Sequence, residues 1–425
     1  MNLRFYNGKI LTGGADTPFA LTPGELHVRG SRIAWIGPCA QPDGPWDREI
    51  DLRGDLVLPG FKNAHTHSAM TFLRSSADDL PLDRWLSEQV FPYEAKLTPE
   101  DVYVFSKLAV AEYLTSGITA NFDMYLMPEP AAAASAECGF RTVLTGAVND
   151  FTQSVRELEG WYHTLNRFDP LISFLPGFHA EYTTSRGLLR ELGEMARDLQ
   201  APMYAHIAET PREVAACIAR YGKTPPALFE ELGIFDYGGG GFHCVYLSEE
   251  DFEIFRRRGV AAVTCPAANL KLSSGIAPVE KLLSSGIRAA IGTDGPAGNN
   301  ALDMFRELYL VSVLAKHRGF DAAALDAAQV LRMACAGGAQ AMRLEDADCL
   351  AVGKLADLTV LSLDAPNMQP VNNPVKNIVY AGSKSNVRMT VVNGRILYEN
   401  GEFFIGEEIG AIYEKAAAAT RRILG

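Results

Sequence analysis

The sequence predicts an α/β protein with a (β/α)8 TIM barrel and a small β-sandwich domain built from both chain ends. Between residues 56 and 345, eight short apolar runs alternate with helical segments, which is the pattern of such a barrel. Residues 1–55 and 346–405 instead alternate apolar and polar positions in short runs broken by Gly and Pro, which indicates antiparallel strands. Because both ends share this pattern, we expect them to pair into one domain beside the barrel.

The predicted β-domain takes its strands from two distant stretches. The N-terminal runs are "LRFYNGKILTG", "GELHVRGSRIAWIG" and "REIDLRG", and the C-terminal runs are "GKLADLTVLSL", "VKNIVYAG" and "VRMTVVNGRILYENGEF". Within the last run, "VVNGRI" carries the Asn-Gly pair of a two-residue hairpin turn. Residues 406–425 are predicted to form an amphipathic C-terminal helix that packs on the surface.

The barrel region contains eight strand candidates with helices between most of them. In order, the candidates are "DLVLPGFKNAHTH", "ITANFDMY", "RTVLTGAV", "LISFLPGFHA", "PMYAHIAET", "GFHCVYL", "VAAVTCPAAN" and "RAAIGTDG". The helix between the first two shows the clearest ends. Thr98 is a plausible N-cap, Pro99 stands at the first helical position, Asp101 lies three residues after the cap, and Gly117 closes the helix.

Composition narrows the function class. The chain has 425 residues, a net charge of −12 and 48% hydrophobic residues, and its densest basic run, 256–258, falls at a predicted helix end. Nucleic-acid binding needs clustered Lys and Arg, so we expect a small-molecule partner. The N-terminus lacks an export signal and no run reaches membrane-spanning length, so we expect a cytoplasmic protein without a membrane partner.

Seven cysteines are scattered without a CxxC pair, at positions 39, 138, 217, 244, 265, 335 and 349. Such a set predicts buried free thiols and neither a disulfide framework nor a zinc-cysteine cluster. Any metal ion must therefore be held by histidine and carboxylate side chains.

Those side chains gather at the carboxyl ends of the predicted barrel strands, where TIM barrels build their active sites. His65 and His67 lie at i and i+2 of the first strand, so their side chains share one face. Each of the other residues alone is readable as an ordinary polar strand end, a turn aspartate or a packed histidine, but the joint pattern predicts a metal site. The set comprises His65, His67, His179, His206, Glu209, His243 and Asp294.

Neutral imidazole and carboxylate are ligands of divalent ions such as zinc, which lower the pKa of bound water to about 7. His65, His67, His206 and Asp294 can supply the protein ligands. Glu209, three residues after His206, is placed to move protons. His243 either completes the metal shell or donates a hydrogen bond to the bound hydroxide.

The sequence resembles the amidohydrolase superfamily, and within it the branch of 5′-methylthioadenosine and S-adenosylhomocysteine deaminases, with triazine hydrolases close by. The matching motifs are "PGFKNAHTHSAMTFLR", "FPYEAKLTPED", "NFDMY", "HIAET", "NLKLSSGIAP", "IGTDGPAGNN" and "GKLADLTVL". They extend over nearly the whole barrel and into the C-terminal tail. This resemblance implies a TIM-barrel hydrolase, often a homo-oligomer.

The resemblance also implies residue roles. It makes His65, His67, His206 and Asp294 the metal ligands, and Glu209 and His243 the proton-handling pair. Glu94 corresponds to the glutamate that holds ribose hydroxyls, and His179 to the histidine near the bound nucleoside. Binuclear members carry a modified lysine at the end of strand four, where this chain has no lysine, so one divalent ion is implied, zinc first, with iron or manganese open.

The implied reaction is hydrolytic deamination of an adenosine-type nucleoside to the inosine analogue and ammonia. Asp294 and His243 help to deprotonate the attacking water, and Glu209 protonates the ring nitrogen beside C6. Retention of Glu209 favours deamination over dechlorination, since the triazine dechlorinases usually lack it. The HxE and PCxxC signature of cytidine deaminases is absent from the sequence.

Two departures from the family pattern concern the substrate. Members that use S-adenosylhomocysteine grip its carboxylate with arginines after strand three; Arg156 can serve here, but the second position falls near Gly146. A neutral 5′-substituted adenosine, or adenosine itself, is therefore expected. Glu181 replaces the usual proline of "HAPYT", which either adds a polar contact to the nucleoside or merely lines the loop.

Two alternatives stay open at this point. A metal-dependent deaminase or hydrolase of another heteroaromatic ring, such as guanine, a pterin or a triazine, would have no ribose for Glu94 to hold. A non-catalytic scaffold is disfavoured because every predicted metal ligand is retained.

Overall fold

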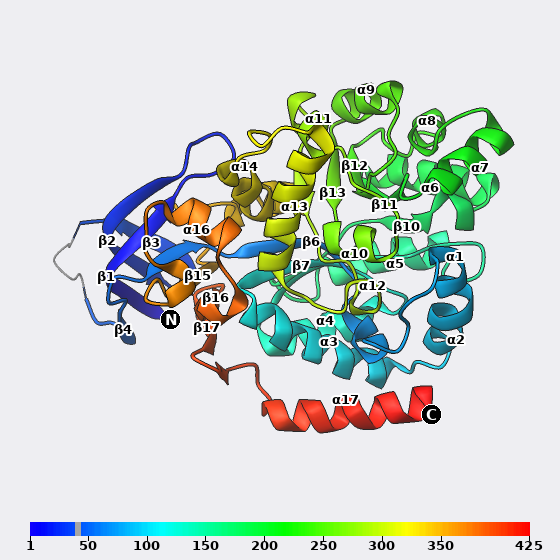
Figure 1. The fold of residues 1–425 in the computed structure, drawn as a ribbon. Coiled ribbons are helices and arrows are strands. Elements are labelled where there is room, and N and C mark those ends of the chain that lie inside the picture. The colour runs from blue at the N-terminus through cyan, green and yellow to red at the C-terminus, as the bar shows by residue number, and fades with distance from the viewer. Residues whose placement is uncertain (39–43) are drawn as a thin grey trace.

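The structure is a computed structural model that describes residues 1–38 and 44–425. A β-rich domain lies beside a larger barrel, and the C-terminal helix α17 (Ile409–Leu424) runs along the barrel against α3 (Pro99–Thr115) (Figure 1). Six cysteines are free, as the sequence predicted, and Cys39 lies outside the described residues. Among the described residues, no helix is both long and apolar enough to cross a membrane.

Both chain ends build the β-rich domain. Its nine strands form one hydrogen-bonded sheet in the order β18-β17-β16-β15-β5-β1-β2-β3, with β4 paired to β1. The two ends meet where β5 pairs antiparallel with β15, for example through Leu58 and Thr359. The strands are β1 (Asn2–Thr12), β2 (Ala20–Arg29), β3 (Arg32–Gly37), β4 (Arg48–Asp51), β5 (Leu56–Pro59), β15 (Leu358–Leu361), β16 (Val387–Val392), β17 (Arg395–Glu399) and β18 (Glu402–Phe403).

The stretch "DLVLPGFKNAHTH", predicted as one barrel strand, is two strands in different sheets. Its first part is β5, and the barrel begins with β6 (Phe61–Thr66), so the β-rich sheet reaches Pro59, beyond the predicted limit at residue 55. Gly60 separates the two strands. A Cβ at this position would lie 2.1 Å from the Thr119 side chain, so only glycine allows the chain to pass so close.

The prediction of a strand at "VKNIVYAG" is wrong, because the segment is helix α16 (Pro374–Tyr380). Asn373 is its N-cap and accepts a hydrogen bond from the Lys376 backbone N–H at 3.0 Å, and Pro374 fits the first helical turn. Its apolar residues Ile378 and Val379 are buried, and the helix packs against α13 (Met304–Gly319) and α14 (Ala327–Arg332). The Asn-Pro start outweighs the β-branched residues that suggested a strand.

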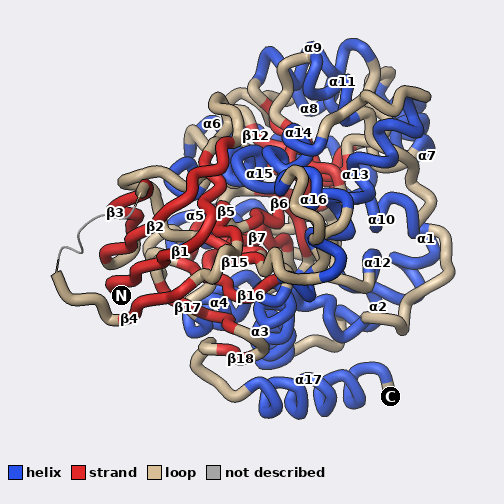
Figure 2. The backbone as a smooth tube through the Cα atoms, turned by 60° about the vertical axis from the view of Figure 1, so that its left-hand side comes forward, coloured by secondary structure: helices blue, strands red, loops and turns tan. Residues whose placement is uncertain are grey.

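The barrel strands are parallel and form two sheets, with helices around them (Figure 2). Backbone hydrogen bonds join the sheets at both gaps, from Asp294 N–H to His65 O at 3.0 Å and from His179 N–H to Val148 O at 3.0 Å. This is the predicted TIM-barrel architecture, with its fourth strand split into β9 and β10. The strands are β6, β7 (Ile118–Met124), β8 (Arg141–Thr145), β9 (Ile172–Phe174), β10 (Gly177–Ala180), β11 (Met203–Ile207), β12 (Gly239–His243), β13 (Val260–Thr264) and β14 (Ala289–Ile291).

Helix ends follow the predicted signals. The Thr98 side chain accepts from the Asp101 N–H and Asp101 accepts from the Thr98 N–H, which is the predicted capping box of α3. The other principal helices of the barrel region are α4 (Pro128–Cys138), α5 (Val155–Leu165), α6 (Arg186–Leu199), α7 (Pro211–Tyr221), α8 (Pro225–Glu231), α9 (Glu249–Arg258), α10 (Pro266–Lys271), α11 (Val279–Ser284) and α12 (Pro296–Asn299).

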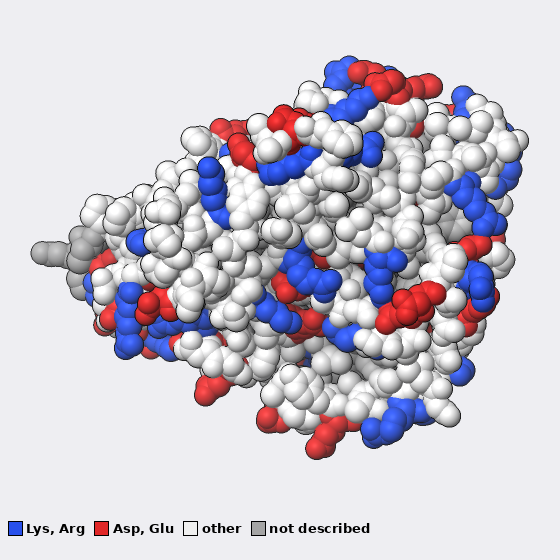
Figure 3. Space-filling view, in the orientation of Figure 1, with Lys and Arg blue, Asp and Glu red and all other residues white. Residues whose placement is uncertain are grey.

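The basic run at the end of α9 is paired with acids. Arg257 and Arg258 both contact Glu230, at 2.7 Å and 2.8 Å, and Arg256 contacts Glu253 at 2.7 Å. On the face shown in Figure 3, basic and acidic side chains are likewise interspersed. This run therefore offers a mixed surface and no cluster of free cations for a phosphate backbone.

Candidate active site and metal centre

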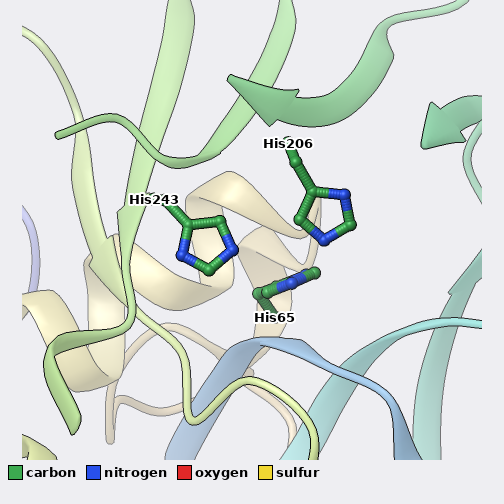
Figure 4. A group of neighbouring side chains, drawn as sticks. All are labelled: His65, His206 and His243. Atoms are coloured by element: carbon green, nitrogen blue, oxygen red, sulfur yellow. The ribbon is translucent and has the colours of Figure 1, made fainter. Parts of the chain in front are cut away.

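The predicted site residues meet at the carboxyl ends of the barrel strands. His65 lies near the end of β6, His206 on β11 and His243 at the end of β12, and the three imidazoles point toward one another (Figure 4). His67 and Asp294 follow β6 and β14. Since neighbouring barrel strands end at the same rim, residues from the first and last strands become neighbours there.

The ligand atoms of these side chains lie at the spacing of a metal site. Two groups, His65–His206–His243 and His65–His67–Asp294, each place their nitrogen and oxygen atoms within 4.8 Å of one another. Asp294 Oδ1 lies 3.3 Å from His67 Nε2 and 3.7 Å from His65 Nε2. The arrangement brings together four imidazoles and one carboxylate, a donor set suited to a divalent transition ion.

His65 supplies an independent test of this fit. Its ring is fully buried and lies on Phe242 with 3.9 Å between ring centres, and neither ring nitrogen has a hydrogen-bond partner among the described residues. Buried polar nitrogens without partners are costly, and a cation would satisfy one of them. Burial and the surrounding imidazoles lower the pKa of His65 well below its usual value, so the ring is neutral, as a metal ligand must be.

The other three histidines are oriented through their Nδ1 atoms. The ring of His67 hydrogen-bonds the Met124 carbonyl, that of His206 bonds the His179 carbonyl, and that of His243 bonds Asn269 Oδ1, each at 2.7 Å. Because these oxygens accept a hydrogen bond from Nδ1, the Nε2 of each ring faces the centre and offers a lone pair when the ring is neutral. The motif "NLKLSSGIAP" contained Asn269, but no spacing rule assigned it this orienting role.

Glu209 stands beside the cluster. It is buried, its Oε1 accepts a hydrogen bond from Ser274 Oγ at 2.9 Å, and its Oε2 lies 3.8 Å from His243 Nε2. Three turns around the site hold residues other than glycine in the left-handed region: Ala208 at φ 52°, His243 at φ 69° and Asp294 at φ 59°. Such strain persists where the surroundings over-determine the backbone, which is common at functional sites.

A cavity of about 550 Å³ opens from this cluster, a size suited to one small ligand. Glu94 and His179 are among the residues that line it. Burial raises the pKa of Glu94 to about 7, against the opposing effect of the Tyr125 hydroxyl. Burial, with the nearby His67 and His243, lowers the pKa of His179 to about 4.

Comparison with known proteins decides the family. The model of the amidohydrolase family matches residues 56–397, which is most of the chain. The chain belongs to the amidohydrolase family. This is the family that the sequence motifs predicted, and the residues predicted to bind the metal lie within the matched range.

Relatives of this amidohydrolase carry a common name. It is 37% identical to the 5-methylthioadenosine/S-adenosylhomocysteine deaminase of Thermoanaerobacter pseudethanolicus, over 95% of each chain. It is 40% identical to the protein of that name from Syntrophobacter fumaroxidans, over 94% of this chain and 93% of the relative. Among solved structures, an adenosine deaminase from Xanthomonas campestris with bound zinc superposes with a TM-score of 0.92 at 33% identity, over 99% and 98% of the two chains.

Arg156, the predicted carboxylate contact of the amidohydrolase, and the two departures from the family pattern, Glu181 and Gly146, are not among the residues that line the cavity. Arg156 is exposed on α5 and is not among the residues that line the cavity. Glu181 is buried against Arg220 of α7, with contacts of 2.6 Å and 2.8 Å, so it lines the loop and does not face the ligand space. A Cβ at Gly146 would lie 2.5 Å from the end of the Leu158 side chain, so a larger residue there would force Leu158 to move.

One wall of the cavity was missed by sequence reasoning. The segment of short helices α1 (Leu82–Arg84), η2 (Trp85–Val90) and α2 (Phe91–Glu94) covers the ligand space and carries Glu94. The apolar side chains in "PLDRWLSEQVFPYEA" are the sequence feature that could have indicated this wall. The lining residues from this segment are Leu82, Trp85, Leu86, Val90, Phe91, Glu94 and Ala95.

Proposed function

We propose that this amidohydrolase is a metal-dependent deaminase that converts adenosine-type nucleosides and water to the inosine analogue and ammonia. The observation that carries the proposal is the position of Glu209 beside the histidine and aspartate cluster, in the wall of a cavity that Glu94 also lines. The relatives named as deaminases of 5-methylthioadenosine and S-adenosylhomocysteine support the same substrate class.

One divalent ion, zinc before iron or manganese, would be held by His65, His67, His206 and Asp294. The zinc bound in the adenosine deaminase structure supports this order, and the unpartnered nitrogens of His65 support a bound cation. Such an ion lowers the pKa of water and so supplies the nucleophile near neutral pH.

The protein's own groups handle the protons. Asp294 and His243 take up the proton of the water that adds to C6 of the adenine. Glu209, held by Ser274, delivers a proton to the ring nitrogen beside C6. The ring nitrogen therefore gains no negative charge when the water oxygen adds to C6. Collapse of the tetrahedral carbon then breaks the C6–N bond, and the amino group leaves as ammonia with the water proton returned from Asp294 and His243. The C6 hydroxyl loses its second proton to Glu209 and becomes the carbonyl, while the ring nitrogen keeps the proton that Glu209 delivered.

Glu94 and His179 would position the nucleoside. A carboxylate at Glu94 accepts hydrogen bonds from both ribose hydroxyls, which orients the sugar and hence the base. His179 lies against His206, with 5.0 Å between ring centres, and borders the same space.

The 5′ end of the substrate is proposed to be neutral. Within residues 1–38 and 44–425, those that line the cavity include no Lys or Arg, so an amino-acid tail would enter without a cation for its carboxylate. Arg156 would have to leave its exposed position on α5 to serve such a tail. We therefore rank adenosine, 5′-deoxyadenosine and 5′-methylthioadenosine above S-adenosylhomocysteine.

Ammonia release and the ultraviolet change test the proposal. The substrates are adenosine, 5′-deoxyadenosine, 5′-methylthioadenosine, S-adenosylhomocysteine, guanine and cytosine, with zinc- and manganese-loaded protein beside Glu209→Gln. Turnover of adenosines that the variant loses supports the deaminase. No turnover by fully loaded protein redirects the search to guanine analogues, pterins and triazines, and an absence of bound metal leaves the scaffold alternative.

A homo-oligomer and a cytoplasmic location also remain proposals for this enzyme. Sedimentation of the loaded protein and cell fractionation test them separately.

A further inference from the structure

The turn between β11 and α7 carries Glu209 and is held in an unfavourable backbone conformation. Ala208, the residue before it, has φ 52°, in the left-handed region that residues with a Cβ avoid. On one side, the Ala208 carbonyl accepts the backbone N–H groups of Val245 and Tyr246 at 3.1 Å and 2.9 Å. The backbone N–H groups of the same turn therefore need a separate hydrogen-bond acceptor to hold the turn in this conformation.

That partner is the carboxylate of Glu213, from the first turn of α7. Its Oε1 accepts the Ala208 N–H and its Oε2 accepts the Glu209 N–H, both at 2.8 Å. An ordinary capping box would return this side chain to the N-cap, Thr210, but here it reaches the two residues before the cap. Both oxygens are used, so a carboxylate fits where an amide would offer one acceptor and one opposing donor.

The position of this carboxylate is costly. Glu213 is 5% exposed, and burial together with the charge of Glu209 raises its pKa to about 7. A role in helix capping alone does not explain a buried acid beside another acid. The two hydrogen bonds to the turn do explain it, because they place the backbone from which Glu209 extends.

We propose that Glu213 is a positioning residue that holds Glu209 in the orientation needed for proton transfer. Glu213 fixes the main chain, Ser274 fixes one oxygen of the Glu209 carboxylate at 2.9 Å, and the other oxygen faces His243 at 3.8 Å. The inference rests on the proposed function, in which Glu209 delivers a proton to the substrate ring. Misplacement of such a group by small distances slows chemistry without loss of binding.

The test is Glu213→Gln in the zinc-loaded enzyme, with Asp251→Asn as the matched control. Asp251 is also a buried acid in the first turn of a barrel helix. Its carboxylate accepts a hydrogen bond from the N–H of the N-cap residue Ser248 at 2.8 Å, and it contacts no described residue of the site. We expect Glu213→Gln to lower kcat about 10- to 100-fold with KM and metal content unchanged, the range for partners that orient active-site groups. Asp251→Asn should keep kcat.

A double variant separates positioning from general stability. If Glu213 acts through Glu209, Glu209→Gln/Glu213→Gln will be no slower than Glu209→Gln alone. Additive losses, a kcat for Glu213→Gln equal to that of the wild type, or a loss that parallels metal loss would each overturn the inference. Should Glu213→Gln fail to fold, Glu213→Asp, whose shorter arm cannot reach both amides, is measured against the same expectations. A wild-type enzyme inactive on every adenosine would instead remove the proposed function.

Discussion

His67 and Asp294, which follow the first and last barrel strands, face each other with 3.3 Å between Nε2 and Oδ1. Their positions are tied through the main chain, because the Asp294 N–H donates to the His65 carbonyl at 3.0 Å and the Thr66 hydroxyl donates to the Asp294 carbonyl at 3.1 Å. The proposed metal centre thus lies where the first and last barrel strands meet, and the carboxylate that follows the last strand lies beside the histidines of the first.

Asp294→Asn should therefore weaken metal binding and slow the reaction. The amide keeps the shape but removes the negative charge and the proton acceptor, so we expect kcat to fall at least about a hundredfold. Metal content after dialysis and initial rates at saturating zinc measure the two effects. Asp346→Asn, at an exposed pair with Arg32, is the control and should change neither.

Asn269→Leu should disturb His243 without removing it. The variant loses the acceptor that lies 2.7 Å from His243 Nδ1, so the ring can exchange its two nitrogens and turn. We expect kcat to fall about 10- to 100-fold with folding preserved. Steady-state rates and circular dichroism provide the measurement, and unchanged rates would show that the ring is oriented by other contacts.

The raised pKa of Glu94 predicts that kcat/KM for nucleosides depends on pH. Burial raises the pKa of Glu94 to about 7, so the carboxylate proposed to accept the two ribose hydroxyls is present above that pH and lost below it. We expect kcat/KM to fall as the pH drops from 8 to 6, roughly tenfold per unit once protonation dominates. Rates from pH 5.5 to 9 test this.

Two controls isolate Glu94 in that profile. Glu94→Gln should have a lower kcat/KM that no longer changes near pH 7. A 2′,3′-dideoxynucleoside offers Glu94 no hydroxyls, so its profile in the wild-type enzyme should lack the same transition. If the transition persists in both controls, it belongs to another group.

Asp357→Asn should destabilise the contact between the barrel and the β-rich domain. Asp357 is buried and holds Arg141 at the start of β8 through contacts of 2.6 Å and 3.2 Å. Removal of one charge leaves a buried guanidinium unpaired, which costs about 3–5 kcal/mol in the free energy of unfolding. Urea denaturation measures this, and a loss below about 1 kcal/mol, the value of an exposed pair, would contradict it.

The stability should also decrease in acid. Burial raises the pKa of Asp357, but Arg141 and Lys62 lower it more, so the folded-state pKa lies below the ordinary value. The pair therefore stabilises the fold above the unfolded-state pKa of about 4, and this contribution is lost as the pH falls through the folded-state value. Asp357→Asn should flatten that part of the stability profile relative to the wild type.

The sequence by itself determined the architecture and the chemical types at the site. Periodicity indicated the strands and helices, and alternate positions on one strand placed His65 and His67 on one face. Local patterns failed where long-range packing decided: Gly60 splits a continuous apolar run between two sheets because the chain passes close to Thr119. At α16 a local capping signal was present in "NNPVKN", but β-branched residues obscured it.

Only the tertiary structure decided how the site residues are held and which of the predicted positions reach the cavity. The partner of His243 lies 26 positions away in Asn269, and nothing in spacing reveals such a contact. Arg156 lies on an exposed helix face, and Glu181 pairs with Arg220, because side-chain direction depends on the packing of α5 and α7. The local sequence contains the types of the site residues and their order along the strands. The orientation, burial and pairing of their side chains arise from contacts between segments that are distant in the chain.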